Sequence, residues 1–220
     1  MEWNLLSGLS VDERRELLMV ARRRTFARNE VVFHRDDPAD TMHLIVRGRF
    51  AVRIVTPLGD TATLALLSPG QTFGEVALLT EEGRRTATVL ALEPGETRSL
   101  HQVDFAALQR RHPQALDVLV RALATRLDAL SAQLVDALYV PADRRVLRRV
   151  AELAALYGEG RDGEVAIPLT QEDIAGLAGT SRATVNRVLR ECEARGLVRL
   201  ERGRTVVLNA AAIVRGGGGR

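Results

Sequence analysis

Two short segments of this chain combine residue types that suit an anionic ligand. The first, Phe73–Leu79, reads FGEVALL, and the second, Arg84–Ala87, reads RRTA. A glycine between bulky residues lets a ligand approach the backbone closely. A short helix over residues 75–79 would present free N–H groups to an anion. The pattern indicates a site for a phosphate-bearing ligand.

The side chains of these segments indicate how such a ligand would be held. Arg85 offers the forked charge that phosphate prefers, and Thr86 offers a hydroxyl donor. Glu75 can accept a hydrogen bond from a ribose 2′-hydroxyl, as acidic residues do in other nucleotide sites. The alternative is a turn of a β-roll in which the glutamate lies on the surface and two arginines are solvated.

A second candidate site lies in residues 169–197, which read LTQEDIAGLAGTSRATVNRVLRECEARGL. Thr170 is placed to cap a helix, with Asp173 completing a capping box. Gly179-Thr180 makes a turn, and Ser181 caps a second helix that ends at Gly196. The spacing predicts a helix–turn–helix.

The second helix of this pair carries arginines away from its apolar face. Val185, Leu189 and Cys192 share one face, whereas the polar residues point elsewhere; these are Arg182, Asn186, Arg187 and Arg190. Arginines near the start of such a helix are what reading of the DNA major groove requires. The alternative is a helical hairpin with a solvated basic face.

Composition limits the class of protein. The chain has 220 residues, enough for one large or two modest domains, and no apolar run approaches a membrane span. A single cysteine excludes a disulfide framework, so we expect a cytoplasmic protein with no membrane partner. The net charge is only +3, but residues 140–220 carry 14 arginines against 10 acids. This distribution favours the C-terminal part as the one that faces a polyanion.

The N-terminal half is expected to be mostly β structure. Residues 1–23 read as an amphipathic helix capped by Ser10, and Leu17, Leu18 and Val20 are expected on its inner side. Short strands separated by glycine and proline turns follow, at 30–33, 42–46, 50–55, 61–67, 87–92 and 97–100. Regular short strands with such turns predict a barrel or roll. Helical periodicity returns at Asp104.

A long helix after Pro113 has a heptad pattern. Its apolar residues step alternately by four and three, namely Leu116, Val120, Leu123, Leu127, Leu130, Leu134 and Ala137. We call this row the seam. A second copy of the same helix is the simplest partner, which predicts a C2 homodimer. The alternative is packing inside one domain. Pro141 ends the helix and marks a domain boundary.

The remaining C-terminal elements complete a DNA-binding module. The sequence predicts a helix over residues 144–157 and a loop over residues 158–163. After the helix–turn–helix, strands at 197–200 and 205–208 flank a hairpin turn that carries Arg202 and Arg204. A helix–turn–helix followed by a basic hairpin is a winged helix. The glycine tail at 216–219 is expected to be disordered.

Over nearly its whole length, the chain resembles the cyclic AMP receptor protein branch of the CRP/FNR family of bacterial transcription regulators. The segments that carry the resemblance are HLIVRGRFAVRI, FGEVALL with RRTA, the long helix, and TSRATVNRVL, in that order and spacing. The resemblance implies an α+β fold with a cyclic-nucleotide-binding β-roll (1–112), a dimerisation helix (113–140) and a winged helix–turn–helix (141–220). It also implies a hinge at 139–143 through which the ligand reorients the DNA-binding domains, and RNA polymerase as a partner.

The resemblance assigns ligand contacts residue by residue. It makes Gly74 and Glu75 ribose contacts, and Arg85 and Thr86 phosphate contacts. Family members that bind cyclic AMP usually have Thr-Ser reaching the adenine, whereas this chain has Leu130-Ser131. Leucine cannot accept from the adenine amino group, so one hydrogen bond, about 1 kcal/mol net, would be missing. The expected ligand-binding set is Gly74, Glu75, Val76, Ala77, Arg85, Thr86, Ala87, Leu130 and Ser131.

The recognition helix also departs from the family pattern. Both arginines, Arg182 and Arg187, are present and each suits a guanine, but Ala183 stands where an acid would contact cytosine. We therefore expect a palindromic DNA site relaxed at one position per half-site. The expected DNA-binding set is Thr170, Ser181, Arg182, Ala183, Thr184, Asn186, Arg187, Arg202 and Arg204.

Other sensor chemistries and other functions find little support. Cys192 stands alone, unlike the ligands of an iron–sulfur cluster, and the histidines lack metal-type spacing; they are His34, His43, His101 and His112. We expect no enzyme constellation and no metal site, and the resemblance implies a cyclic nucleotide as the effector, with cyclic AMP favoured. Two alternatives stay open. The protein could be a family member that needs no effector or binds another one such as cyclic di-GMP, or a nucleotide-binding module that contacts protein instead of DNA.

Overall fold

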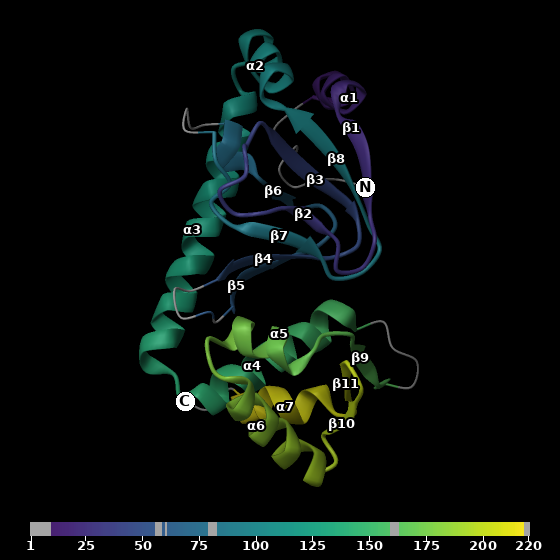
Figure 1. Cartoon of the computed structure of the whole chain (residues 1–220), viewed down its shortest axis with the longest axis vertical. Coiled ribbons are helices and arrows are strands. Elements are labelled where there is room, and N and C mark those ends of the chain that lie inside the picture. The colour runs from purple at the N-terminus through teal and green to yellow at the C-terminus, as the bar shows by residue number, and fades with distance from the viewer. Residues whose placement is uncertain (1–9, 56–58, 60, 79–82, 159–162, 218–220) are drawn as a thin grey trace. The chain divides into compact units, whose positions relative to one another are not determined.

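The computed structural model describes residues 10–55, 59, 61–78, 83–158 and 163–217, and its first helix begins at the predicted cap. The Ser10 side chain accepts from the Glu13 N–H while Glu13 accepts from the Ser10 N–H, forming a capping box. Figure 1 shows helix α1 (Val11–Val20). This helix buries Leu17, and Leu18 packs beside it. Residues 1–9 of the predicted helix lie outside the described residues.

The predicted end of this helix at residue 23 is wrong. Residues Arg22–Phe26 form strand β1, which pairs antiparallel with β8 (Gly95–His101). Hydrogen bonding along this ladder and the burial of Phe26 outweigh the helix propensity of three consecutive arginines. Val20, predicted on the inner side, is exposed.

The first compact unit comprises residues 1–59 and 64–130 and contains two sheets. Among the described residues, one sheet has the order β1-β8-β3-β6 and the other β2-β7-β4-β5. The remaining bounds are β2 Val31–Phe33, β3 Thr41–Arg47, β4 Phe50–Val55, β5 Thr61–Leu67, β6 Thr72–Phe73 and β7 Thr88–Ala91. Strands β4 and β5 match their predicted bounds, the other predicted strands differ by one or two residues at their ends, and β6 was not predicted.

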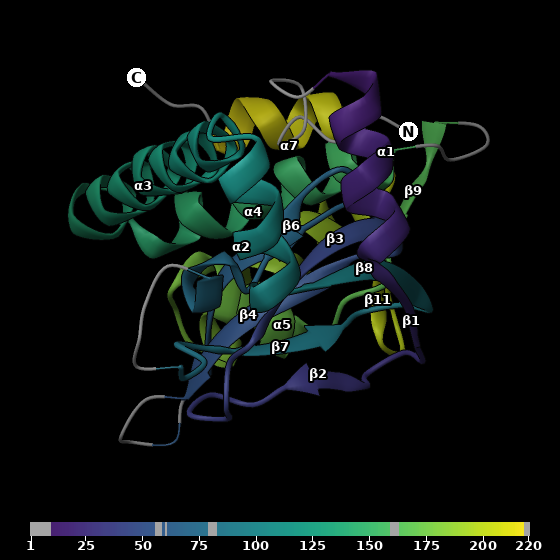
Figure 2. The ribbon, with the colours of Figure 1, turned by 90° about the horizontal axis from the view of Figure 1, so that it is seen from above.

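Two apolar clusters hold this unit together. One contains side chains from both sheets, namely Phe26, Ile45, Phe50, Val52, Leu67, Phe73, Ala87, Val89 and Ala91. The other joins β3 and β8 to α1, to α2 (Gln102–Arg111) and to the start of α3, through residues such as Leu17, Leu44 and Leu119. Figure 2 shows α1 and α2 beside this sheet. Helix α2 begins at Gln102 rather than Asp104 because the His101 side chain accepts from the Val103 N–H.

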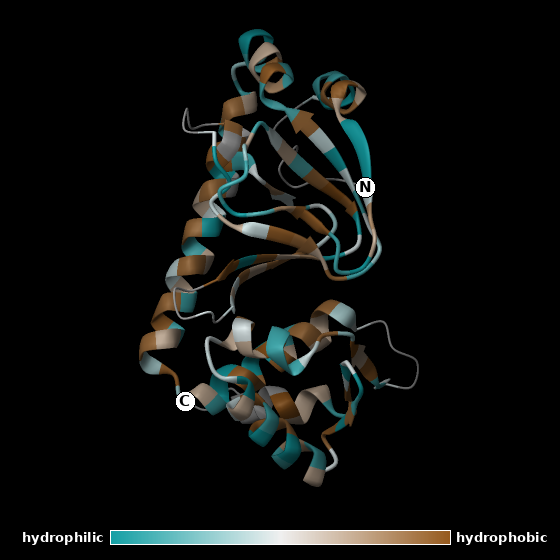
Figure 3. Ribbon diagram, viewed as in Figure 1, coloured by the Kyte–Doolittle hydropathy of each residue, from teal (hydrophilic) through white to brown (hydrophobic). Residues whose placement is uncertain are grey.

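Helix α3 (Ala115–Tyr139) is 25 residues long, and most of its seam is not covered by this chain. Leu127, Leu134 and Val120 are 65%, 61% and 56% exposed. Hydrophobic residues recur along the helix between hydrophilic ones (Figure 3). Water contact over such a regular apolar row is unfavourable, so α3 has the surface of a helix that packs against another one.

The second unit comprises residues 60–63 and 131–220. It contains α4 (Ala142–Tyr157), α5 (Gln171–Ala178), α6 (Arg182–Ala194) and α7 (Ala210–Gly217), with a sheet of order β10-β11-β9. The strands are β9 Val165–Ile167, β10 Val198–Glu201 and β11 Arg204–Val207. Helix α4 begins two residues before its predicted start. The core residues include Val146, Val150, Ile174, Val185, Leu189 and Cys192, which confirms the apolar face predicted for the second helix.

The C-terminal glycine tail is not as expected. Gly216 and Gly217 belong to α7, a helix that was not predicted, and residues 218–220 lie outside the described residues. The helix is explained by Ile213, which is buried, because α7 packs against α4. The strand β9 was also missed, and most of the predicted loop at 158–163 lies outside the described residues. In the part of the chain that the structure describes, no helix is long and apolar enough to cross a membrane.

Candidate ligand cavity and nucleic-acid interface

The first unit contains a cavity of about 370 Å³ at the two predicted ligand segments. Strands β2, β4, β5 and β7, the 3-10 helix η2 (Glu75–Leu78) and helix α3 line it. The polar side chains in its wall are Glu75, Arg84, Arg85, Thr86 and Arg126. The rest of the wall is formed by Phe33, Val52, Ile54, Leu64, Phe73, Gly74, Val76, Ala87, Val89, Leu123, Leu127 and Leu130. A cavity of this size with few polar groups is typical of a small-molecule site.

Arg85 is buried in the wall of this cavity, only 5% exposed. Its Nη1 and Nη2 donate to the carbonyl and hydroxyl oxygens of Thr41 at 2.6 and 2.7 Å, and its guanidinium lies 4.0 Å above the Phe33 ring. Burial lowers the pKa of Arg85, and the nearby acids Asp40 and Asp37 oppose that shift. No carboxylate of the described residues forms an ion pair with it, so an anion can neutralise this cation.

Glu75 is buried as well, at 3% exposure, and α3 supplies its partner. Arg126 Nη1 donates to Glu75 Oε1 at 2.8 Å. The other carboxylate oxygen, Oε2, is buried and has no hydrogen-bond partner among the described residues, and the same is true of Arg85 Nε. Unpaired buried polar atoms are rare in native proteins unless a ligand or water completes them. The alternative of a surface glutamate beside two solvated arginines is therefore wrong for Glu75 and Arg85, although Arg84 is exposed.

Gly74 explains how the two segments come together. Its φ is +79°, and a Cβ at this position would lie 2.8 Å from Arg85 Nη1 and 2.9 Å from the Thr41 carbonyl oxygen. Any side chain would therefore strain the backbone and push against the arginine. Only glycine lets the backbone of residues 74–75 lie against the guanidinium of Arg85.

A buried histidine lies next to this site. His43 is stacked on Phe73 with ring centroids 4.8 Å apart, and its Nδ1 is 3.0 Å from the Thr97 hydroxyl. Burial, reinforced by the charges of Arg85 and Arg24, lowers the pKa of His43 to about 3. The imidazole is thus neutral at neutral pH and adds no charge beside Arg85.

Most of the predicted ligand-binding residues line the cavity. Gly74, Glu75, Val76, Arg85, Thr86, Ala87 and Leu130 all line it, while Ser131 is exposed and the side chain of Ala77 lies outside the described part. The sequence reasoning missed Arg126 and Phe33. A signal for Arg126 existed, since it is an arginine flanked by seam positions on a helix that was predicted to reach the ligand.

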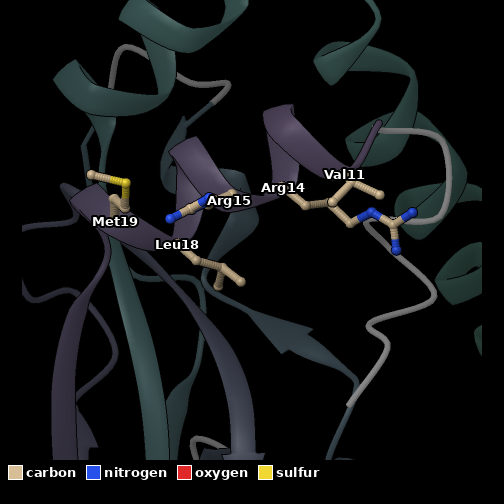
Figure 4. Close-up of a pocket in the computed structure, with 5 residues that line it drawn as sticks. All are labelled: Val11, Arg14, Arg15, Leu18 and Met19. Atoms are coloured by element: carbon tan, nitrogen blue, oxygen red, sulfur yellow. The ribbon is translucent and has the colours of Figure 1, made fainter.

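A second hollow, of about 380 Å³, lies along the outer side of α1 (Figure 4). Its lining residues are Val11, Arg14, Arg15, Leu18 and Met19, which all belong to that one helix. Among the described residues only this helix lines the hollow, so no second described element brings polar groups toward a ligand there. The cavity at Arg85 is therefore the better candidate site.

The helix–turn–helix is built as its caps predict. Thr170 accepts from the Asp173 N–H, and Asp173 accepts from the Thr170 N–H. Gly179 is left-handed at the end of α5, Ser181 accepts from the Thr184 N–H to cap α6, and Gly196 (φ +66°) follows its end. The hydroxyls of Thr170 and Ser181 are therefore used in capping.

The polar face of α6 carries two arginines that differ in their ion pairs. Arg182 is exposed and has no ion pair with a carboxylate of the described residues. Arg187 is exposed too, but its Nη2 donates to Asp143 Oδ1 at 2.5 Å and its Nη1 donates to Glu191 at 2.9 Å. Hydrogen bonding to Asp143 first, and then to Glu191, raises the pKa of Arg187.

The other predicted DNA residues lie on the same unit. Ala183 and Asn186 are exposed on α6, where Asn186 Nδ2 donates to Gln171 at 3.0 Å, and Thr184 is half-buried. Arg202 and Arg204 are exposed at the β10–β11 turn, and Arg204 Nε donates to Glu201 at 2.6 Å. These positions are compatible with DNA contact, and their roles stay predictions.

Arg145 fixes α4 to the helix–turn–helix, a role that the sequence did not reveal. Its Nε and Nη2 donate to the carbonyl oxygens of Ala178 and Gly179, both at 2.8 Å, at the end of α5. Its Nη1 donates to the Val140 carbonyl oxygen at 2.8 Å. Basic groups at a helix C-terminus satisfy carbonyls that lack intrahelical partners, so this contact orients α5 and α4 together.

Comparison with known proteins defines the class of this chain. Residues 23–112 match the family model of the cyclic nucleotide-binding domain, and residues 144–215 match that of the Crp-like helix-turn-helix domain. A nucleotide-binding roll joined to such a domain is a ligand-binding transcription regulator.

Two individual relatives show which family this chain belongs to. The Thermus thermophilus cyclic AMP receptor protein is 34% identical over 95% of this chain and 94% of its own length. The Mycobacterium tuberculosis CRP-like cAMP-activated global transcriptional regulator is 30% identical over 84% of this chain and 82% of its own length. The chain belongs to the CRP/FNR family of transcription regulators, in its cyclic AMP receptor protein branch. This confirms the resemblance and the DNA-binding, non-enzymatic function.

Solved structures agree on the fold. The crystal structure of the Thermus thermophilus catabolite activator protein is 33% identical, covers 97% of this chain and 99% of its own, and has a TM-score of 0.56. The c-di-GMP responsive global regulator CLP of Xanthomonas campestris has a TM-score of 0.80 at 19% identity, with 90% of this chain and 99% of its own covered. At that identity the second likeness bears on the fold alone, which confirms the predicted β-roll, long helix and helix–turn–helix.

Proposed function

We propose that this protein is a homodimeric regulator whose binding to palindromic DNA is controlled by a cyclic nucleotide, with cyclic AMP as the favoured effector. The observation that carries the proposal is the pair of unsatisfied buried groups in one cavity, Glu75 Oε2 and Arg85 Nε. A cyclic nucleotide has the two complementary groups: a phosphate for Arg85 and a ribose 2′-hydroxyl for Glu75. The two relatives described above, both at least 30% identical to this chain, are named for cyclic AMP, which favours that nucleotide.

The exposed seam of α3 supports the dimer. A C2 pairing of two α3 helices would cover the row that includes Val120, Leu127 and Leu134. A dimer also provides the two-fold symmetry that a palindromic site needs, with half-sites about 34 Å apart. Arg182 and Arg187 are the proposed base-reading residues, and Arg202 and Arg204 are proposed to contact phosphates.

The cavity and the seam share residues, which suggests how the effector acts. Leu123, Leu127 and Leu130 line the cavity and also belong to the seam. Filling the cavity would therefore change how these leucines pack against the partner helix. We propose that α3 passes this change to the hinge at 139–143 and so to the DNA-binding domain.

RNA polymerase is the proposed protein partner, and the cytoplasm, where bacterial DNA lies, is the proposed location.

Thermal denaturation of the full-length protein with a panel of nucleotides tests the effector. The panel contains cyclic AMP, cyclic GMP, cyclic di-GMP and, as a control, linear AMP. A ligand at 100 times its dissociation constant adds about 2.7 kcal/mol to the stability of the folded state, so a bound effector gives a clear upward shift of Tm. A shift with cyclic AMP supports the proposal. A shift with cyclic di-GMP alone, or with none of the four, contradicts it.

A further inference from the structure

Arg187 on α6 lies between two carboxylates of the second unit. Its Nη2 donates to Asp143 Oδ1 at 2.5 Å, and its Nη1 donates to Glu191 Oε1 at 2.9 Å. Arg182, the other arginine predicted to read a base, is exposed and has no ion pair with a carboxylate of the described residues. Of these two arginines, Arg187 is therefore the one whose guanidinium is oriented before DNA binds.

The position of Asp143 beside Arg187 is set by the packing of α4. Glu191 lies four residues after Arg187 on the same helix, whereas Asp143 is the second residue of α4. Two residues later, Arg145 donates to two carbonyl oxygens at the end of α5, both at 2.8 Å. Helix α4 also packs against α6. The start of α4 is thus fixed to the helix–turn–helix, and Asp143 with it.

The two ion pairs leave Arg187 with donors for a base. Arginine has five N–H donors, of which Asp143 and Glu191 take two, so three remain. Guanine accepts two hydrogen bonds from one guanidinium, at O6 and N7. A long side chain loses rotamer freedom when it binds, and one that is already held loses less. A carboxylate that orients this guanidinium therefore favours its contact with guanine.

We propose that Asp143 is a positioning residue for DNA recognition, which holds the guanidinium of Arg187 toward guanine and so increases discrimination at one base pair of each half-site. The inference rests on the proposed function, because it requires that Arg187 reads a base. Two carboxylates around one guanidinium also leave a net negative charge, which repels a polyanion. Asp143 thus increases specificity while it lowers the affinity for DNA of any sequence.

Fluorescence anisotropy with the full-length protein and cyclic AMP tests this inference. The reference duplex is selected from a random library, and each base pair of its half-sites is changed in turn. Arg187→Ala identifies the base pair that Arg187 reads, because discrimination there should fall about 5- to 150-fold, the contribution of a bidentate pair. Asp143→Asn is expected to lower discrimination at the same base pair about three- to tenfold, and to bind a scrambled duplex at least as tightly as the wild type.

Glu172→Gln is the matched control for the loss of charge. Glu172 is exposed and, like Asp143, is the second residue of its helix, but it forms no ion pair with an arginine of the described residues. This variant is expected to keep full discrimination at every base pair. The double variant Asp143→Asn with Arg187→Ala is expected to discriminate as Arg187→Ala does, because Asp143 acts through the arginine.

The outcomes separate this inference from the proposed function. Both side chains of the ion pair are about half exposed, so its loss costs little stability and Asp143→Asn should fold. Discrimination by Asp143→Asn that equals or exceeds that of the wild type overturns the inference alone. Weaker binding to every duplex, or lost discrimination at base pairs that Arg187 does not read, indicates a merely structural role and overturns it as well. If Arg187→Ala keeps full discrimination everywhere, the proposed base reading by Arg187 fails, and the inference fails with it.

Discussion

Arg126 on α3 and Glu75 in η2 form an ion pair, 2.8 Å from Nη1 to Oε1, in which the glutamate is only 3% exposed. This pair joins the helix that carries the seam to the segment that faces the ligand cavity. A buried carboxylate keeps its charge at moderate cost only while a partner compensates it. The ligand segment and α3 are therefore linked by electrostatics as well as by apolar packing.

Replacing Arg126 should reveal this link. Arg126→Met keeps most of the apolar stem but leaves Glu75 buried without a partner, so we expect a loss of about 1–3 kcal/mol of unfolding free energy. The double variant Arg126→Met with Glu75→Gln should recover part of that loss, because it removes the uncompensated charge. Urea denaturation of the four proteins in this cycle measures the coupling. Additive losses would contradict the pairing.

Arg85 and Arg84 provide a matched test of the cavity. Arg85→Ala removes a buried cation that suits a phosphate, and we expect cyclic AMP affinity to fall about 10- to 100-fold, as for the loss of a charge-assisted hydrogen bond. Arg84→Ala removes the same charge from a side chain that also lines the cavity but is exposed, so solvent screening should keep the loss of affinity below about threefold. Equal effects of the two substitutions on calorimetric affinity would place the phosphate elsewhere.

A single charged substitution on α3 tests whether the seam is the dimer interface. Leu134→Arg places a charge in the proposed helix pairing, and the dimer should dissociate at micromolar concentrations in sedimentation equilibrium. Ala132→Arg is the control, because residue 132 is exposed and lies on the opposite side of the helix from Leu134, at about 100° per residue. A dimer that survives Leu134→Arg would exclude the seam as the interface.

His43 predicts how stability depends on pH. Its pKa falls from 6.5 to about 3 on folding, so between these values the unfolded chain binds a proton that the folded chain does not. Stability should therefore decrease as pH falls below about 6.5, and the histidine should account for about 2 kcal/mol between pH 7 and pH 5. In urea denaturation at these two pH values, His43→Gln should show a smaller decrease than the wild type. The same decrease in both proteins would disprove the assignment.

The elements that the sequence predicted well are those with local signals. Ser10, Thr170 and Ser181 are caps whose partners lie three residues away, and the seam of α3 repeats within one helix, so both are readable from spacing. The end of α1 was misread because β1 owes its structure to a strand some 70 residues away. Helix α7 was missed for a similar reason, since it depends on packing against α4.

In the candidate site, too, local patterns were predicted and contacts between distant residues were missed. Gly74, Glu75 and Arg85 were predicted because they are close in sequence and chemically matched. The pairing of Glu75 with Arg126 crosses 51 residues, and the contact of Arg187 with Asp143 crosses 44, so no local pattern reveals either. The burial of Glu75 and Arg85 could not be predicted either. A glutamate on the surface and a buried one look the same in a sequence, and only the fold distinguishes them.

The most direct test of effector control is the affinity of the full-length protein for DNA with and without cyclic AMP. A duplex first selected from a random library by the cyclic AMP-bound protein serves as the site, with a scrambled duplex as control, and fluorescence anisotropy at fixed salt gives both affinities. We predict that cyclic AMP tightens binding to the selected duplex at least tenfold, and that Arg85→Ala removes this effect while retaining the effector-independent affinity. Equal affinity of the wild-type protein with and without cyclic AMP would contradict the account.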